Sequence, residues 1–188
     1  MQSRFVLASS SPRRRELLSS IGWMFDVVAP EVDESPIPSE TPTDTALRLA
    51  RSKALSVSAA ESGRVCIGAD TVVDVDGRIF GKPHDREDAR RMLRLLSGRE
   101  HTVHTGVALA RDGVLLADGL ETTVVRFAAL DGEEIESFAS SGMGDDKAGA
   151  YAIQGIGATL VERIDGCYYN VVGLPIRLLY SLVKKLKV

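Results

Sequence analysis

The feature that most constrains how this chain folds is a short apolar run followed by small hydroxyl residues and a proline. Phe5, Val6 and Leu7 have the composition of a buried strand, and the segment ASSSPRR at residues 8–14 follows directly. Proline is favoured at the first position of a helix, where its missing N–H costs nothing. The sequence therefore predicts a strand, a tight turn and a helix that begins at Pro12.

The same turn has the chemistry of an anion-binding site. The first N–H groups of a helix are unpaired and carry partial positive charge. The hydroxyls of Ser9 and Ser11 and the guanidinium groups of Arg13 and Arg14 would add donors suited to phosphate oxygens. The segment alone leaves open a second interpretation, a capped surface helix with solvated arginines, because Ser-Pro helix starts are common.

The composition is that of a globular protein large enough for one sizeable core or two small lobes. The chain has 188 residues, 44% of them hydrophobic and 26% charged, so we expect a single domain over residues 1–188. A formal charge of −3 disfavours binding to nucleic acid through bulk electrostatics, although a few well-placed cations would still hold a small anion. No window approaches the ~20 apolar residues of a membrane-spanning helix. We do not expect the first apolar run to be a signal peptide, because it stops at Ala8 and serines and arginines follow. We expect a cytoplasmic protein that binds neither membrane nor nucleic acid.

Strand and helix patterns alternate along the whole chain. Strands are expected at residues 25–29, 65–69, 72–75, 101–110 and 114–127, with Asp-Gly turns at 76–77 and 112–113 that are typical of hairpins. A further hairpin is expected from residues 160–164 and 167–172.

Capping residues mark the helix starts. Helices are predicted after Thr43, Asp85 and Asp131 and from Pro175, and the segment Asp131–Glu134 has the pattern of a capping box. Residues 142–157 are rich in glycine and form an irregular loop of the kind that usually has a function. The lysines 184, 185 and 187 suit the negative end of the last helix. The order of elements predicts an α/β fold with a central mixed sheet flanked by helices.

Polar residues that follow the predicted strands are candidates for one shared cleft. These are the turn at residues 9–14, the pair Asp33-Glu34 and the pair Asp70-Thr71. Ligands in α/β sheets bind outside strand ends. With Lys53 and Lys82, the set combines cations for phosphoryl oxygens with carboxylates for Mg²⁺ or Mn²⁺. Taken singly, each residue is more often a turn residue or a solvated side chain.

Other hydrolytic and metal-binding patterns are missing from the sequence. There is no Gly-x-Ser-x-Gly elbow to place a serine nucleophile beside His84, His101 or His104, and no P-loop motif. Cys66 and Cys167 lie too far apart for a zinc motif.

The order of the motifs resembles the Maf-like nucleoside triphosphate pyrophosphatases, also called septum formation protein Maf. The resemblance covers nearly the whole chain and rests on blocks at residues 8–14, 33–34, 50–54, 68–73, 81–83, 97–98, 146–155 and 170–175. It implies an elongated α/β fold with a cleft between two lobes, a divalent metal and a homodimer. It also implies hydrolysis of nucleoside triphosphates to monophosphate and pyrophosphate.

The resemblance also implies roles for individual residues. Asp70 would be the general base or a metal-bound carboxylate, and Glu34 its metal-binding neighbour. The triphosphate would be held by Ser9, Arg13, Lys53 and Lys82. Arg13, Thr71 and Gln154 mark the family branch that acts on dTTP and UTP, whereas the branch acting on 7-methyl-GTP has Trp and Gln at the first two positions. Gln154, with a donor and an acceptor, suits the O4 and N3–H edge of uracil and thymine, although it would equally serve to stabilise a loop.

Two other functions stay open at this point. One is a nucleotide-binding regulator of cell division without significant turnover, for which a water-activating carboxylate would be unnecessary. The other is a pyrophosphatase for purine analogues such as ITP.

Overall fold

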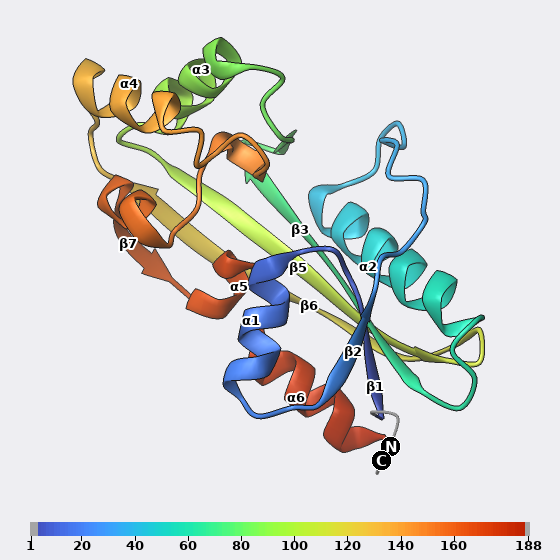
Figure 1. Cartoon of the computed structure of the whole chain (residues 1–188). Helices are drawn as coiled ribbons and strands as arrows, with labels where there is room; N and C mark the ends of the chain where they lie inside the picture. Colours follow the sequence, from blue (N-terminus) through green and yellow to red (C-terminus); the bar gives the residue numbers. More distant parts are fainter. Residues whose placement is uncertain (1–3, 187–188) are drawn as a thin grey trace.

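The computed structural model describes residues 4–186, and these form one mixed sheet of seven strands covered by helices (Figure 1). The strand order is β2-β1-β3-β5-β6-β7, with β4 paired to one end of β3. β1 pairs in parallel with β2 and β3, and the remaining pairs are antiparallel. The strands are β1 (Phe5–Ala8), β2 (Phe25–Val28), β3 (Val65–Val75), β4 (Arg78–Phe80), β5 (Glu100–Arg111), β6 (Val114–Phe127) and β7 (Val161–Asp165). The expected α/β fold is confirmed.

Helices cover both faces of the sheet. α2 (Pro42–Ser58) lies across β3, β5 and β6 on one face, whereas α1 (Pro12–Ser20), α5 (Tyr168–Val172) and α6 (Ile176–Lys185) lie on the other (Figure 1). α3 (Arg86–Leu96) and α4 (Gly132–Ser140) pack together at the far end of the long strands. Of two short 3₁₀ turns, η1 (Ala148–Ala150) lies in the glycine-rich loop, and η2 (Gly155–Leu160) begins at its end.

β3 changes partners along its length, and this creates an open stretch of strand. β1 pairs with β3 only as far as Gly68, and β4 joins at Val73. Within the described chain, residues 69–72 therefore have β5 on one side and no strand on the other. Asp70 and Thr71 lie in this stretch with side chains on opposite faces of the sheet, because successive residues of a strand alternate.

Glycines allow α2 to lie unusually close to the sheet. A Cβ on Gly68 would come within 2.2 Å of the Ala50 carbonyl oxygen, and one on Gly106 within 2.3 Å of the Ala46 carbonyl oxygen. No larger residue fits without moving the helix. This close approach brings Lys53, one turn beyond Ala50, beside Asp70, which is two residues beyond Gly68 on the same face of β3.

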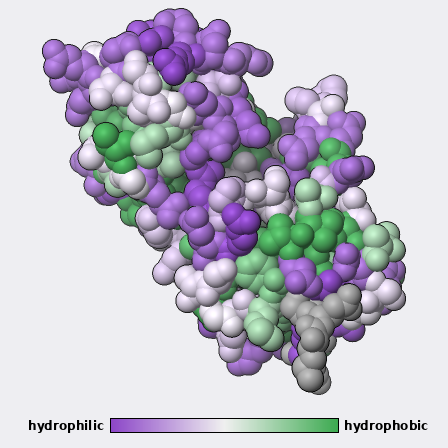
Figure 2. Space-filling view, in the orientation of Figure 1, coloured by the Kyte–Doolittle hydropathy of each residue, from purple (hydrophilic) through white to green (hydrophobic). Residues whose placement is uncertain are grey.

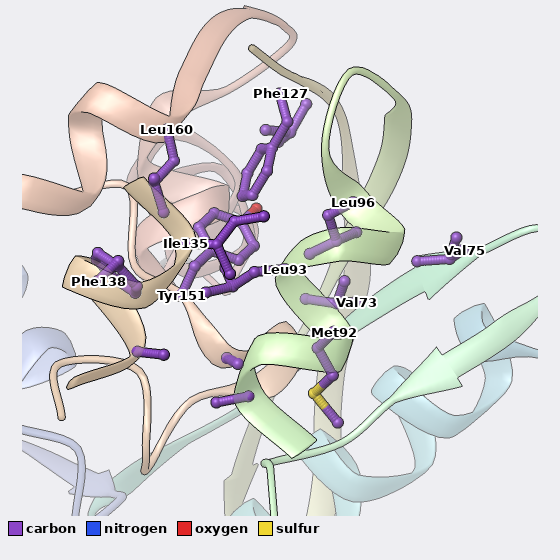
Figure 3. Close-up of a cluster of buried hydrophobic side chains, with 14 of the residues drawn as sticks. Val73, Val75, Met92, Leu93, Leu96, Phe127, Ile135, Phe138, Tyr151 and Leu160 are labelled. Carbon is purple, nitrogen blue, oxygen red and sulfur yellow. The ribbon is translucent and has the colours of Figure 1, made fainter. Parts of the chain in front are cut away.

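Two hydrophobic clusters make up most of the core. The first joins α3, α4 and the glycine-rich loop to the outer ends of β3, β5 and β6, with Leu93, Phe127, Ile135 and Tyr151 in contact (Figure 3). The second joins α1 and α6 to β1, β3 and β5 through residues such as Leu7, Leu18, Ile67 and Leu179. The clusters support the two lobes of the sequence prediction, and the polar groups described below lie between them.

The helix caps confirm several sequence predictions. Ser11 caps α1 with Pro12 at its first position, Asp85 caps α3, and Asp131 with Glu134 forms the capping box of α4. Lys184 and Lys185 lie in the last turn of α6. Lys187 lies outside the described residues.

Three local predictions are wrong. α2 is capped by Thr41, not Thr43, because Pro42 takes the first helical position. Residues 168–172 form helix α5 instead of a hairpin strand, since Asn170 is drawn into the interior by hydrogen bonds to β5 and β6. β3 does not end before Asp70, because its pairing with β5 continues from Cys66 to Asp74.

None of the helices described in residues 4–186 is both long and apolar enough to span a bilayer.

Candidate active site

A cleft of about 1030 Å³ opens between the two lobes and gathers all of the candidate site residues except Asp33. Figure 2, in the orientation of Figure 1, shows the surface hollowed between the part over α3 and α4 and the part over the start of α2. The cleft is lined by the residues predicted from the sequence, namely Ser9, Ser11, Arg13, Arg14, Glu34, Lys53, Asp70, Thr71, Lys82 and Gln154. Asp33 does not line it and instead accepts the backbone N–H of Ser35.

A charged cluster lies on the α2 side of β3. The ammonium of Lys53 is 2.6 Å from Asp70 Oδ1 and 2.7 Å from Glu34 Oε1. The Lys53 and Asp70 side chains are 9% and 13% exposed, whereas that of Glu34 is 57% exposed. A buried cation therefore holds two carboxylates at one point, and the Glu34 arm is open to exchange with solvent or ligand.

The turn before α1 forms the neighbouring wall. Ser9 is buried, and its hydroxyl accepts the Ser11 N–H at 3.2 Å, while the Ser11 hydroxyl accepts the Arg14 N–H at 3.5 Å. The hydroxyls thus shape the turn predicted as an anion site. Arg13 reaches the cleft, where burial lowers its pKa and the Asp146 and Glu16 charges raise it.

Arg14 is more firmly held than Arg13. Its Nε donates to the Gly173 carbonyl at 2.7 Å, and its Nη2 donates to Thr71 Oγ1 at 3.0 Å. Burial lowers the pKa of Arg14, and the Asp70 charge acts in the opposite direction. Three of its N–H groups are committed to protein atoms, counting a 3.4 Å contact of Nη1 with Ser9 Oγ. A guanidinium has five, so two remain for a ligand.

The opposite wall carries further charges. Lys82 follows β4 and is exposed, and Lys147 pairs with Asp146 in the glycine-rich loop. The N–H of Gly149 donates to the Gly81 carbonyl at 3.0 Å and so ties this loop to the Lys82 segment. Asp146 and Lys147 line the cleft but were not predicted as site residues, although both belong to a block that carries the family resemblance.

The Thr71 side of the cleft is mostly apolar. Val103, Ile153, Val171 and Val172 line it, together with Tyr151 and Gln154. This surface contrasts with the charged α2 side and suits a flat ring with few charges.

His101 anchors the part of the glycine-rich loop that contains Tyr151. Its Nε2 lies 2.7 Å from the hydroxyl of Tyr151, and both side chains are buried edge-on against Phe127. Burial lowers the pKa of His101 to about 4 and raises that of Tyr151, so both groups are neutral at pH 7.

The donor set is compatible with a divalent cation. Carboxylate oxygens are ligands of Mg²⁺ and Mn²⁺, and Mg²⁺ commonly binds through one or two carboxylates together with substrate phosphates and water. Glu34 and Asp70 already meet on one cationic nitrogen. Among the described residues, no group of three or more His, Cys, Asp and Glu side chains is placed to hold a metal.

The chain is similar to three curated relatives over almost their full length. The chain is 55% identical over 177 residues to a dTTP/UTP pyrophosphatase of Geobacter metallireducens, covering 93% of this chain and 91% of the relative. It is 52% identical to one of Symbiobacterium thermophilum, with 92% and 89% covered, and 49% identical to one of Carboxydothermus hydrogenoformans, with 97% and 98% covered.

A solved structure and a family model complete the comparison. The Staphylococcus aureus Ham1 protein matches 96% of this chain and 98% of its own with a TM-score of 0.49 and 15% identity, a likeness too weak to add to the assignment. The family model described as Maf-like protein matches residues 4–186. Together with the relatives, this match shows that the chain belongs to the Maf family.

Proposed function

We propose that this protein hydrolyses nucleoside triphosphates, with dTTP and UTP as preferred substrates, to the nucleoside monophosphate and pyrophosphate. One observation carries the proposal: a single cleft brings two carboxylates, a buried lysine and the α1 turn together beside an apolar wall. The names of relatives about 50% identical over most of the chain support the same activity.

The triphosphate is assigned to the polar side of the cleft. Arg13 approaches it from α1, Lys53 from α2 and Lys82 from the segment after β4, and the N-terminal end of α1 adds partial positive charge. Ser9 and Ser11 keep the turn in shape through their hydrogen bonds, and Arg14 has two N–H groups left for an oxygen. These cations would neutralise charge that builds up on the leaving pyrophosphate, which is the main requirement of phosphoryl transfer.

Glu34 and Asp70 would hold a divalent cation, Mg²⁺ or Mn²⁺, together with phosphate oxygens of the nucleotide. When bound, the metal would supply charge neutralisation and acidify a coordinated water. Lys53 would shift from bridging the two carboxylates to contacting a phosphate oxygen as the metal and nucleotide arrive.

Asp70 is assigned the activation of water. Its carboxylate would accept a proton from a water whose oxygen forms a bond to the α-phosphorus. The bond between the α-phosphorus and the bridging oxygen breaks, and its electrons leave with pyrophosphate. The position of Asp70 on an open stretch of β3 allows a water to approach from the side that no strand covers.

The base is assigned to the apolar side, next to Thr71 and Gln154. A pyrimidine ring would lie against Val103, Ile153 and Val172, where the side-chain amide of Gln154 would meet its polar edge. The alternative role as a regulator of cell division without turnover is not favoured, since the curated relatives are named as enzymes.

A direct experiment measures pyrophosphate release from dTTP, UTP, CTP and ITP with Mg²⁺, with Mn²⁺ and with EDTA. We expect turnover of dTTP and UTP that depends on the metal and is lost with EDTA. Tight binding of nucleotide without release of pyrophosphate under all metal conditions would contradict the proposal and support the regulator. A cytoplasmic location and a homodimer stay predictions, and sedimentation of the purified protein tests the second.

A further inference from the structure

A chain of buried hydrogen bonds leads from the cleft across the face of the sheet that α5 covers. Thr71 Oγ1 lies 3.0 Å from Thr105 Oγ1 on the neighbouring strand β5, and Thr105 Oγ1 lies 3.0 Å from the backbone carbonyl oxygen of Asn170. Thr105 and Asn170 are fully buried. The side-chain amide of Asn170 donates to the Val103 carbonyl and to Thr123 Oγ1, which fixes α5 against β5 and β6.

The protons in this chain have one arrangement that satisfies every contact. A carbonyl oxygen only accepts, so the single hydroxyl proton of Thr105 must point to Asn170. Thr105 then accepts from Thr71, because two hydroxyl oxygens at 3.0 Å need one proton between them. The proton of Thr71 is therefore directed into the protein and away from the cleft.

The Thr71 hydroxyl oxygen also accepts a hydrogen bond from Arg14. The Arg14 Nη2 donates to Thr71 Oγ1 at 3.0 Å, and the guanidinium group is held by the Gly173 carbonyl. A hydroxyl has one proton and two lone pairs. With the proton given to Thr105 and one lone pair taken by Arg14, Thr71 has a single lone pair left to offer a ligand.

We propose that Thr105, as a positioning residue, makes the Thr71 hydroxyl an acceptor only, so that the cleft selects a base with a hydrogen-bond donor at N3. The inference rests on the proposed function for the presence of a nucleotide. Uracil and thymine carry N3–H, whereas cytosine has a bare N3 lone pair that would face the lone pair of Thr71. A buried acceptor that faces another acceptor stays without a hydrogen bond, because the buried network cannot reorient. Such a mismatch lowers kcat/KM strongly.

The test compares Thr105→Val with Thr105→Ser and with Thr102→Val. The valine variant removes the acceptor for the Thr71 proton, which then becomes free to donate to cytosine N3. The serine variant keeps a hydroxyl at the same place. Thr102 lies on the same strand with its side chain on the opposite face, so its replacement by valine makes the same chemical change away from the cleft.

The readout is the ratio of kcat/KM for UTP to that for CTP. We expect this ratio to fall by about tenfold or more in Thr105→Val and to stay at the wild-type value in Thr105→Ser and Thr102→Val. A purely structural role of Thr105 would lower both rates together and leave the ratio unchanged. A ratio within about twofold of wild type in a folded Thr105→Val variant would overturn the inference.

Wild-type protein provides an independent measurement if Thr105→Val does not fold. UTP methylated at N3 lacks the donor, so we expect both it and CTP to be poor substrates beside UTP. Turnover of either at the rate of UTP overturns the inference. If no nucleotide is hydrolysed at all, the proposed function fails, and the inference is then decided by the ratio of dissociation constants for UTP and CTP in wild type and in the valine variant.

Discussion

Asp70 and Thr71 are neighbours in sequence, yet the structure treats them in opposite ways. Asp70 faces α2 and meets Lys53 and the exposed Glu34 in a cluster of charges. Thr71 faces α5 and joins a neutral, buried chain of hydroxyl, carbonyl and amide groups that is anchored in β5 and β6. The alternation of side chains along one strand thus separates a cluster of two carboxylates and a lysine from a buried network of hydroxyl, carbonyl and amide groups across a single peptide bond.

This contrast suggests a division of labour. An ion pair with an exposed partner, such as that of Lys53 with Glu34, exchanges readily with ligand and solvent. A site that cleaves a phosphoryl bond needs such exchange when its substrate binds. The hydroxyl groups of Thr71 and Thr105 have one hydrogen-bond arrangement in the buried network, which suits selection of a ligand. We therefore expect changes on the α2 side to alter turnover and changes on the α5 side to alter base preference.

Removal of the Asp70 carboxylate should have the largest effect on turnover. Asp70→Asn keeps the shape of the side chain but loses the proton acceptor, so kcat should fall by about 100-fold or more. Asp33→Asn is a matched control, because Asp33 lies beside Glu34 in sequence but does not line the cleft. Pyrophosphate release measures both variants, and a kcat for Asp70→Asn within about tenfold of wild type would remove Asp70 from the mechanism.

The two lysines of the cleft should differ in their effects. Lys53→Met leaves Glu34 and Asp70 without the cation that joins them, and loss of charge-assisted hydrogen bonds of this kind corresponds to about 100-fold in kcat/KM. Lys82 is exposed, so Lys82→Met should cost about tenfold, mainly through KM. Equal losses in the two variants would show that burial of Lys53 between the carboxylates has no special role.

The smallest effect on turnover at pH 7 is expected for His101, whose role is stability. Its pKa is about 4 in the folded protein and about 6.5 in an unfolded chain, so the unfolded chain binds more protons between these pH values. The contribution of His101 is therefore complete above pH 6.5 and falls by up to about 3 kcal/mol as the pH drops to 4.

His101→Asn tests this assignment through the pH dependence of unfolding. The variant should be less stable than wild type at pH 7, because the contact with Tyr151 is weakened, but its free energy of unfolding should vary less between pH 6.5 and 4. Denaturant unfolding at several pH values gives both quantities. Parallel curves for wild type and variant would show that His101 is not buried in its neutral form.

Local signals in the sequence were enough to predict much of the fold. Pro12 after a serine, Asp85 and the Asp131–Glu134 pair specify helix starts through hydrogen bonds within four residues, and the structure has all three. The hairpins at Asp76-Gly77 and Asp112-Gly113 were equally predictable, because Asp76 and Asp112 both have the positive φ that these turns require.

Long-range pairing explains what the sequence did not predict. The segment YYNVV after Cys167 has the composition of a strand, whereas in the structure it is a helix whose Asn170 is hydrogen-bonded to Val103 and Thr123 on distant strands. Asp70 was expected just beyond a strand, whereas pairing with β5 keeps it inside one. The site residues could be named from motifs, but the ties of Arg14 to Gly173 and of Thr71 to Thr105 join positions far apart in the chain.

The position of bond cleavage tests the central claim most directly. UTP hydrolysed by the wild-type protein in ¹⁸O-labelled water should yield labelled UMP and unlabelled pyrophosphate, because water adds to the α-phosphorus next to Asp70. Label in pyrophosphate, or formation of UDP and inorganic phosphate, would contradict the account of this cleft.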